Sequence, residues 1–379
     1  MRPRHLLLLA LPLGLAAGFY FARNGSTPVK PRGAPTAPTA PESSEAASPP
    51  PAHLPVATAP AKPLPKPVAR LLAEIERLAA LLQIGPNDAA LADLKRALLA
   101  AEPGQSIRAI LQFLGTGADA PTGQDFTIAE RGALDGAPTM RVFLLDLLGQ
   151  LSRTTRSDDA AKFSRALMET KTSADEWALA LRNVAWHEPS AKPYLAGKMR
   201  EMLGHDSWRA TQSAGMLEAF DVIVFTRDTS FVPDLAETQR SGQRELQRAA
   251  AMALDRMAEQ APLDVMTYLN THPTVLADSP MLRADYFAKA DLSQIAQRAA
   301  LEIYLGRPDV GGAEKSKLLS ALATPATVVS DQPLTASPAP DDGAARQAAV
   351  STATTDWLAA GRFPELRTPL QRLQQRVGR

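Results

Sequence analysis

Residues 68–83, VARLLAEIERLAALLQ, carry the pattern that recurs through most of this chain. Leu71, Ile75, Leu78 and Leu82 recur at the spacing of one helix face, and the charged side chains fall at other positions. The stretch therefore predicts an amphipathic helix whose apolar face has to be covered by another helix.

Two further helices are predicted directly after this one. Gly85-Pro86 ends the first helix, Asn87 can cap the second, and Pro103-Gly104 ends the second. A third is predicted over residues 106–114. Short connections of this kind are typical of antiparallel neighbours. We predict an N-terminal helical segment over residues 68–116 and a loop over residues 117–138, where Gly, Asp, Thr and Pro replace the apolar periodicity.

Helical periodicity returns in residues 139–323, which we interpret as the body of the protein. The stretch Val222–Phe225 is the one ambiguous run, and we interpret it as the buried end of a helix because it continues the periodicity of Met216 and Phe220. The predicted helices of the body cover residues 139–152, 158–170, 174–186, 192–203, 208–225, 242–259, 263–271, 279–290, 292–305 and 313–322.

Capping residues stand before several of these helices. Ser157 precedes two aspartates, and Ser173 is followed three residues later by Glu176, the spacing of a capping box. Asp206 or Ser207 before Trp208, and Asp291 before Leu292, are further candidate caps.

The predicted fold class is all-α, built from helical hairpins. Helices of this length without strands form either a compact bundle or a helical-repeat solenoid, and the length of the chain favours the solenoid because single cores stop growing near this size. Residues 176–185, 243–254 and 294–303 are weakly similar to one another and rich in alanine. They resemble the second helices of HEAT-like repeats, although their spacing is unequal and the usual Asp and Arg positions do not recur regularly. The resemblance covers residues 140–323 and implies a superhelix that scaffolds other proteins.

The N-terminal part predicts a location. Residues 5–21 form the longest uncharged apolar run, and we predict a signal anchor over residues 1–23 that crosses the inner membrane once, with the body in the periplasm. The alternative is a cleaved signal peptide with a site at Ala16-Ala17-Gly18, which would leave the protein periplasmic. Residues 24–67 are a proline-rich linker predicted to be disordered, because so few large apolar side chains cannot offset the entropy of ordering.

The C-terminal part predicts a second linker and a last pair of helices. Residues 324–343 are rich in Pro, Ser, Thr and Asp, which predicts a flexible segment. Residues 344–379 predict two helices with several arginines. A basic helix that contacts a partner or lipid is one interpretation; the one we favour is a capping pair whose arginines are solvated near a helix C-terminus.

Composition and motifs argue against most catalytic chemistry. The 379 residues contain 41 Lys and Arg against 40 Asp and Glu, so the chain has no net field to attract nucleic acid. There is no cysteine and no closely spaced histidine pair, and no cofactor or metal is predicted. Nucleotide-binding and hydrolase signatures are also absent. Lytic transglycosylases, which resemble this layout, use a Glu-Ser motif that occurs here only at Glu42-Ser43 within the linker.

These observations predict a membrane-tethered helical scaffold of the cell envelope that binds another protein and is not an enzyme. The alternatives are an all-α envelope enzyme acting on cell-wall glycan and a secreted soluble binding protein. The candidate partner-binding residues are large or basic side chains near helix ends, for which the competing interpretation of the aromatics is burial in the core. They are Trp208, Tyr268, Tyr286, Arg367 and Arg372.

Overall fold

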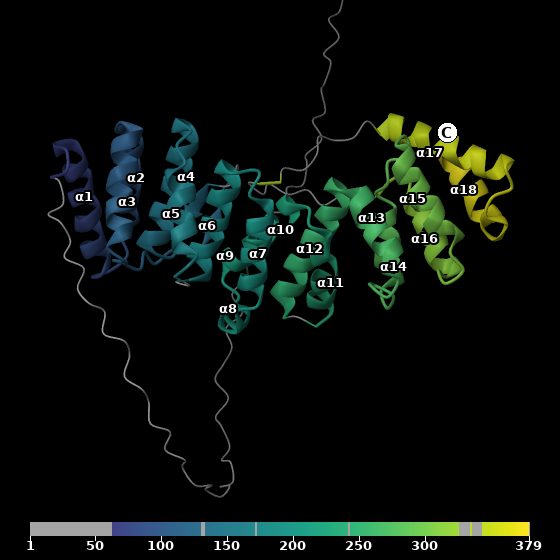
Figure 1. Cartoon of the computed structure of the whole chain (residues 1–379), viewed down its shortest axis with the longest axis horizontal. Helices are drawn as coiled ribbons and strands as arrows, with labels where there is room; N and C mark the ends of the chain where they lie inside the picture. The colour runs from purple at the N-terminus through teal and green to yellow at the C-terminus, as the bar shows by residue number, and fades with distance from the viewer. Residues whose placement is uncertain are drawn as a thin grey trace, which may run out of the picture. The chain divides into compact units, whose positions relative to one another are not determined.

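The computed structural model describes residues 63–129, 133–170, 173–241, 243–325, 334–335 and 343–378. The predicted anchor over residues 5–21, nearly all of the first linker and most of the second lie outside these residues. The described residues belong to one unit, Lys62–Arg379, in which helices near in sequence pack side by side (Figure 1).

Within the described residues the protein is mostly α-helical, and this part of the prediction is confirmed. The helices are α1 (Lys66–Leu82), α2 (Asp88–Ala100), α3 (Pro103–Gly115), α4 (Met140–Thr155), α5 (Asp159–Leu167), α6 (Ala174–His187), α7 (Lys192–Leu203), α8 (Asp206–Thr211), α9 (Ala214–Glu218), α10 (Phe220–Thr226), α11 (Val232–Ser241), α12 (Arg244–Gln260), α13 (Pro262–Thr271), α14 (Pro280–Phe287), α15 (Ile295–Gly306), α16 (Gly312–Ala321), α17 (Gly343–Ala359) and α18 (Arg367–Val377), with the short 3₁₀ helices η2 (Thr229–Phe231) and η3 (Pro364–Leu366). None of these helices is long and apolar enough to cross a membrane.

The core runs between consecutive pairs of these helices. α1 packs on α3, α3 on α4, α4 on α6 and α6 on α9; later in the chain α10 packs on α12, α14 on α16 and α16 on α18 (Figure 1). Each amphipathic helix is therefore covered by near neighbours in sequence. The apolar face predicted for residues 68–83 is buried as expected, with Ile75 fully inaccessible.

The second helix begins as predicted, and the third begins earlier than predicted. Asn87 caps α2 as predicted and accepts a hydrogen bond from the backbone N–H of Ala90 at 3.0 Å. Pro103-Gly104 was predicted to end the second helix. In the structure these two residues form the start of α3. Proline suits the first turn of a helix because its missing N–H would have no partner there. The side chain of Glu102 accepts from the N–H groups of Gly104 and Gln105, both at 2.9 Å, and completes the cap.

The predicted loop over residues 117–138 contains a small antiparallel hairpin. β1 (Thr127–Ile128) pairs with β2 (Leu134–Gly136), and an isolated bridge joins Pro121 to Thr139. Strands of two or three residues are too short to show an alternating pattern, which explains why the sequence predicted only a loop. The hairpin is joined to the helices by Asp146 of α4, whose carboxylate accepts from the N–H of Leu134 at 3.2 Å.

The single helix predicted over residues 208–225 is three short helices, α8, α9 and α10. Gln212 adopts a left-handed conformation with φ of 48°, which ends α8, and the hydroxyl of Ser213 then caps α9 by accepting from Met216 N–H at 3.2 Å. The stretch Val222–Phe225 lies in α10 and is largely buried, as predicted. η2 and α11 were not predicted.

The C-terminal helices continue the packed series. α17 packs on α18, and α18 packs on α16. Trp357 of α17 is fully buried, and its indole N–H donates to Glu302 of α15 at 2.6 Å. Arg298 of α15 pairs with Asp356 at 3.0 Å. The last helix pair is thus attached to the preceding helices by both apolar and charged contacts.

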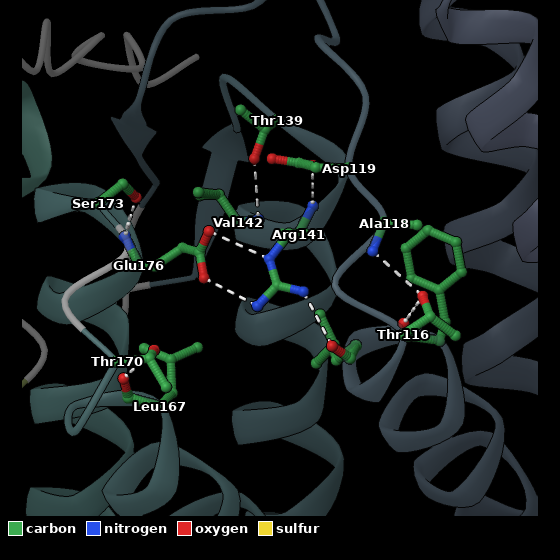
Figure 2. A network of polar contacts seen from close by, with 12 residues as sticks. Thr116, Ala118, Asp119, Thr139, Arg141, Val142, Leu167, Thr170, Ser173 and Glu176 are labelled. Carbon is green, nitrogen blue, oxygen red and sulfur yellow. Dashed lines mark hydrogen bonds and ion pairs between the residues drawn. The ribbon is translucent and has the colours of Figure 1, made fainter. Parts of the chain in front are cut away.

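Two buried arginine–glutamate pairs join alternate helices with the same geometry. Arg141 at the start of α4 donates from Nε and Nη2 to the two oxygens of Glu176 in α6, at 3.1 and 3.0 Å, and from Nη1 to the carbonyl of Leu114 at the end of α3 (Figure 2). Arg283 of α14 makes the same bidentate pair with Glu314 of α16, at 2.7 and 3.0 Å, and its Nη1 donates to the Pro273 carbonyl after α13. The same set of contacts is therefore made by an arginine of α4 and by an arginine of α14.

Candidate functional site

The predicted partner-binding aromatics lie in or against the core. Trp208 of α8 is 8% exposed and packs edge-on against Trp177 with ring centroids 5.2 Å apart, while His205 stacks on its other side. Tyr268 of α13 is half-buried and stacks on His272 at 4.0 Å. Tyr286 of α14 is buried. Trp208 and Tyr286 are thus core residues, and Tyr268 is partly exposed.

The two predicted arginines lie apart from these rings. Arg367 and Arg372 are both exposed on α18. Arg376 of the same helix donates to the carbonyl of Ser320 in α16, and Arg362, just before η3, pairs with Glu302 at 2.6 Å. The structure does not bring the five predicted residues together at one surface.

Tyr286 provides a test of the core interpretation. Burial raises the pKa of its hydroxyl, with nearby Asp255 and Asp285 adding to the effect, and the hydroxyl has no hydrogen-bond partner among the described residues. We expect Tyr286→Phe to leave the free energy of unfolding unchanged or to raise it by up to about 1 kcal/mol, because an unsatisfied buried group is removed. Urea unfolding followed by circular dichroism measures this change.

Tyr304→Phe is the matched control. The Tyr304 hydroxyl donates to the buried carboxylate of Glu314, so its removal is expected to cost about 1.5–3 kcal/mol. A loss for Tyr286→Phe as large as that for Tyr304→Phe would mean that Tyr286 has a polar role.

The histidines act at helix ends. Nδ1 of His187 lies 2.7 Å from the carbonyl oxygen of Asn183, in the last turn of α6. Nδ1 of His272 lies 3.0 Å from the carbonyl oxygen of Tyr268 in the same way. Among the described residues there is no group of three or more His, Asp or Glu side chains placed to hold a metal ion.

A groove between α9, α10 and α12 contains a cavity of about 240 Å³. Its walls are mainly apolar, and charged side chains stand among them. The lining residues are Leu217, Glu218, Phe220, Asp221, Val224, Glu245, Arg248, Ala249, Met252, Ala253 and Arg256.

Two opposite charges are buried in the wall of this groove. Asp221 of α10 is 6% exposed and Arg256 of α12 is 2% exposed. Burial raises the pKa of Asp221, while hydrogen bonds from residues 334–335 and the charge of Arg256 act in the other direction. A buried ion needs polar partners because water no longer solvates it.

Both charges contact a distant segment: Asp221 contacts Leu334 and Thr335, and Arg256 contacts Thr335. One carboxylate oxygen of Asp221 accepts from the backbone N–H of Leu334 at 3.0 Å, and the other accepts from the hydroxyl of Thr335. Nη2 of Arg256 donates to the carbonyl oxygen of Thr335. Asp221 and Arg256 therefore hold a dipeptide of the same chain through its backbone and one hydroxyl.

Leu334 packs against the core and is one of the residues that line a small, mainly apolar space next to the groove. This space is bordered by the hairpin, α6 and α10, and the residues around it include Phe126, Ile128, Leu179 and Val222. Thr335 itself is 4% exposed. In this dipeptide Leu334 therefore lies beside an apolar space, and Thr335 contacts polar groups.

The guanidinium of Arg256 keeps unused donors. Nε and Nη1 are buried and have no hydrogen-bond partner among the described residues, and no carboxylate within that part of the chain forms a salt bridge with Arg256. The buried Arg182 of α6 differs in this respect, because it forms a salt bridge with Asp146 at 2.9 Å.

No family model, curated protein or solved structure matches this chain. The site therefore has to be interpreted from its own geometry.

Neither Asp221 nor Arg256 was predicted as a site residue, although each leaves a signal in the sequence. Asp221 interrupts the apolar run from Phe220 to Phe225, between Leu217 and Val224 on one helix face. Arg256 follows Ala249 and Ala253 at helical spacing, which places a charge on the small-residue face of α12. A charged residue on an apolar helix face indicates a buried polar contact, but it does not identify the partner.

Proposed function

We propose that this chain is a membrane-tethered helical scaffold of the cell envelope whose body binds another protein in the groove between α9, α10 and α12. The observation that carries the proposal is the dipeptide Leu334–Thr335 held across Asp221 and Arg256. A site that holds the backbone of its own chain has the chemistry needed to hold the backbone of a partner.

The helical arrangement supports the scaffold interpretation. Consecutive helices pack in pairs, and the arginine–glutamate clamp of α4 and α6 recurs in α14 and α16. This recurrence is what a body of HEAT-like repeats would have, because each unit of such a body packs on its neighbours by similar contacts. Repeat bodies of this kind present long surfaces to other proteins.

The predicted tether would favour the binding of partners at this groove. An anchor over residues 5–21 and a linker over residues 24–67 would confine the body to a layer above the membrane and raise its effective concentration toward envelope partners. If the signal is cleaved instead, the same groove would act in a secreted binding protein.

The polar contacts in the groove favour binding over catalysis. Asp221 has a raised pKa, as a general acid would, but its two oxygens already accept hydrogen bonds from Leu334 and Thr335. A carboxylate used in this way orients a chain and has no proton placed for transfer. We therefore propose a binding protein in preference to the alternative of a glycan-cleaving enzyme.

Site-specific photocrosslinking in intact cells tests the proposal. Met252 lines the groove, and replacing it with p-benzoylphenylalanine is expected to give a discrete adduct with another protein. The same photoreactive residue at the exposed Gln371 of α18 serves as the control and is expected to give no such adduct.

The adducted protein is then purified and its binding to the full-length chain is measured. Ala249→Arg, which places a large charged side chain in the groove, is expected to weaken this binding at least tenfold, whereas Gln371→Arg is not. The proposal fails if position 252 yields no protein adduct, or if both arginine variants bind the partner equally well.

A further inference from the structure

We propose that the groove recognises the C-terminus of its partner: an extended chain that ends in an apolar residue, then Thr or Ser, then a free carboxylate. Leu334–Thr335 occupies the same place within the chain until such a partner displaces it. The inference rests on the proposed binding function and specifies the ligand of that site.

Asp221 contacts both the backbone and the hydroxyl of the dipeptide. Asp221 accepts from the N–H of residue 334 and from the hydroxyl of residue 335, so one carboxylate contacts both the backbone and the second side chain. A residue without a hydroxyl at the second position would leave one buried oxygen of Asp221 unsatisfied, which costs about 1–3 kcal/mol. Thr or Ser is therefore required there, and the apolar space beside α6 and α10 selects the residue before it.

The donors of Arg256 would be better matched by a terminal carboxylate than by the internal carbonyl of Thr335. Arg256 gives one N–H to the carbonyl of Thr335, and Nε and Nη1 remain without partners among the described residues. An internal peptide carbonyl offers one neutral oxygen. A terminal carboxylate at the same carbon atom offers two oxygens and a negative charge, which matches the fork of a guanidinium.

Arg256 also borders the cavity of the groove. Arg256 both holds the Thr335 carbonyl and lines the cavity of about 240 Å³, and its Nε and Nη1 are buried while the dipeptide is in place. The acidic side chains that share this cavity are Asp221, which is buried and holds the dipeptide, and Glu218 and Glu245, which are less buried than Arg256. A carboxylate placed beside Arg256 would thus pair with the most deeply buried cation of the groove, where hydrogen bonds to charged groups are about twice as strong as neutral ones.

Leu334–Thr335 can be replaced by a partner because it pairs incompletely with Arg256. Leu334–Thr335 satisfies Asp221 fully but Arg256 only in part. A partner with a free C-terminus satisfies both. The internal dipeptide has the advantage of being attached, so a partner has to compete with a high local concentration.

Peptide binding to the purified full-length chain tests the inference. The probe is fluorescein-labelled Asp-Gln-Pro-Leu-Thr, the sequence of residues 331–335, prepared with a free C-terminal carboxylate and, as the matched control, with a C-terminal carboxamide. We expect the acid to bind at least tenfold more tightly than the amide by fluorescence anisotropy. We also expect the double variant Leu334→Gly, Thr335→Gly, which removes the internal competitor, to bind the acid at least fivefold more tightly than the unaltered chain does.

Arg256→Gln is expected to reduce the acid-to-amide ratio to about one while the amide still binds. If this variant does not fold by circular dichroism, the acid-to-amide comparison on the unaltered chain and the response to the glycine variant decide the matter. Equal affinities for acid and amide, or no gain on removing Leu334 and Thr335, would overturn the inference. A photocrosslinked partner at position 252 together with equal peptide affinities would leave the binding function standing and reject C-terminal recognition alone.

Discussion

Glu176→Ala is expected to lower the free energy of unfolding by about 3–5 kcal/mol, the cost of leaving a buried charge without its partner. Arg141 and Glu176 have side chains that are 9% and 6% exposed, and they form two parallel hydrogen bonds between α4 and α6. Without the glutamate, the guanidinium keeps only its bond to the Leu114 carbonyl. Urea unfolding at neutral pH, followed by circular dichroism, measures the loss.

Two variants separate this effect from the loss of an ordinary ion pair. Asp93 pairs with Arg96 on the surface of α2, where the side chains are 67% and 78% exposed, so Asp93→Ala is expected to change the free energy of unfolding by less than about 1 kcal/mol. The double variant Arg141→Met, Glu176→Leu removes both buried charges and is expected to recover most of the lost stability. A loss for Glu176→Ala no larger than that for Asp93→Ala would show that the pair is solvated in solution.

Glu176 also shows where sequence reasoning reached its limit. The spacing from Ser173 to Glu176 predicted a capping box, and the hydroxyl of Ser173 does accept from the N–H of Glu176 at 3.1 Å. The carboxylate, however, pairs with Arg141, which is 35 residues away. Capping is a local property that spacing can predict, whereas the destination of a long charged side chain depends on tertiary packing.

The helices themselves were largely predictable because an amphipathic helix is encoded within its own residues. The errors occurred where local conformation overrides apolar periodicity. Gln212 takes a left-handed conformation in the middle of an apolar pattern, and it divides residues 208–225 into separate helices. Pro103 begins a helix where proline was interpreted as a break, because position within the first turn decides its effect.

The groove could not be predicted from spacing at all. Asp221 and Thr335, which are 114 residues apart, belong to a helix and to a segment that the sequence predicted only as a flexible linker. The pattern indicated charges on apolar helix faces at Asp221 and Arg256, and no more. The five residues chosen from the sequence were selected for size and charge near helix ends, and such features do not show which side chains meet.

Gly149→Ala is expected to destabilise the protein by about 1–3 kcal/mol, although alanine normally favours a helix interior over glycine. Gly149 lies on the buried side of α4, and a Cβ atom added there would lie 2.9 Å from Cγ of Asn183 and 3.2 Å from its Nδ2. Asn183 is itself fully buried in α6 and donates to the carbonyl of Leu145 at 3.1 Å, so it cannot move away without losing that bond. The glycine is therefore needed for the close approach of α4 and α6, and urea unfolding measures the cost of filling it.

Gly197→Ala provides the matched control, because Gly197 is exposed in α7 and an added Cβ would meet no atom within 4 Å. There the same substitution is expected to raise the free energy of unfolding by about 0.5–1 kcal/mol, the difference in helix propensity. The two changes are chemically identical, so opposite signs would isolate the packing of α4 against α6. In an Asn183→Ala background, where the obstructing amide is gone, Gly149→Ala is expected to cost less than half of what it costs in the unaltered chain. Stabilisation by Gly149→Ala, or an equal cost in both backgrounds, would mean that the helices adjust and that Asn183 does not hold them at this distance.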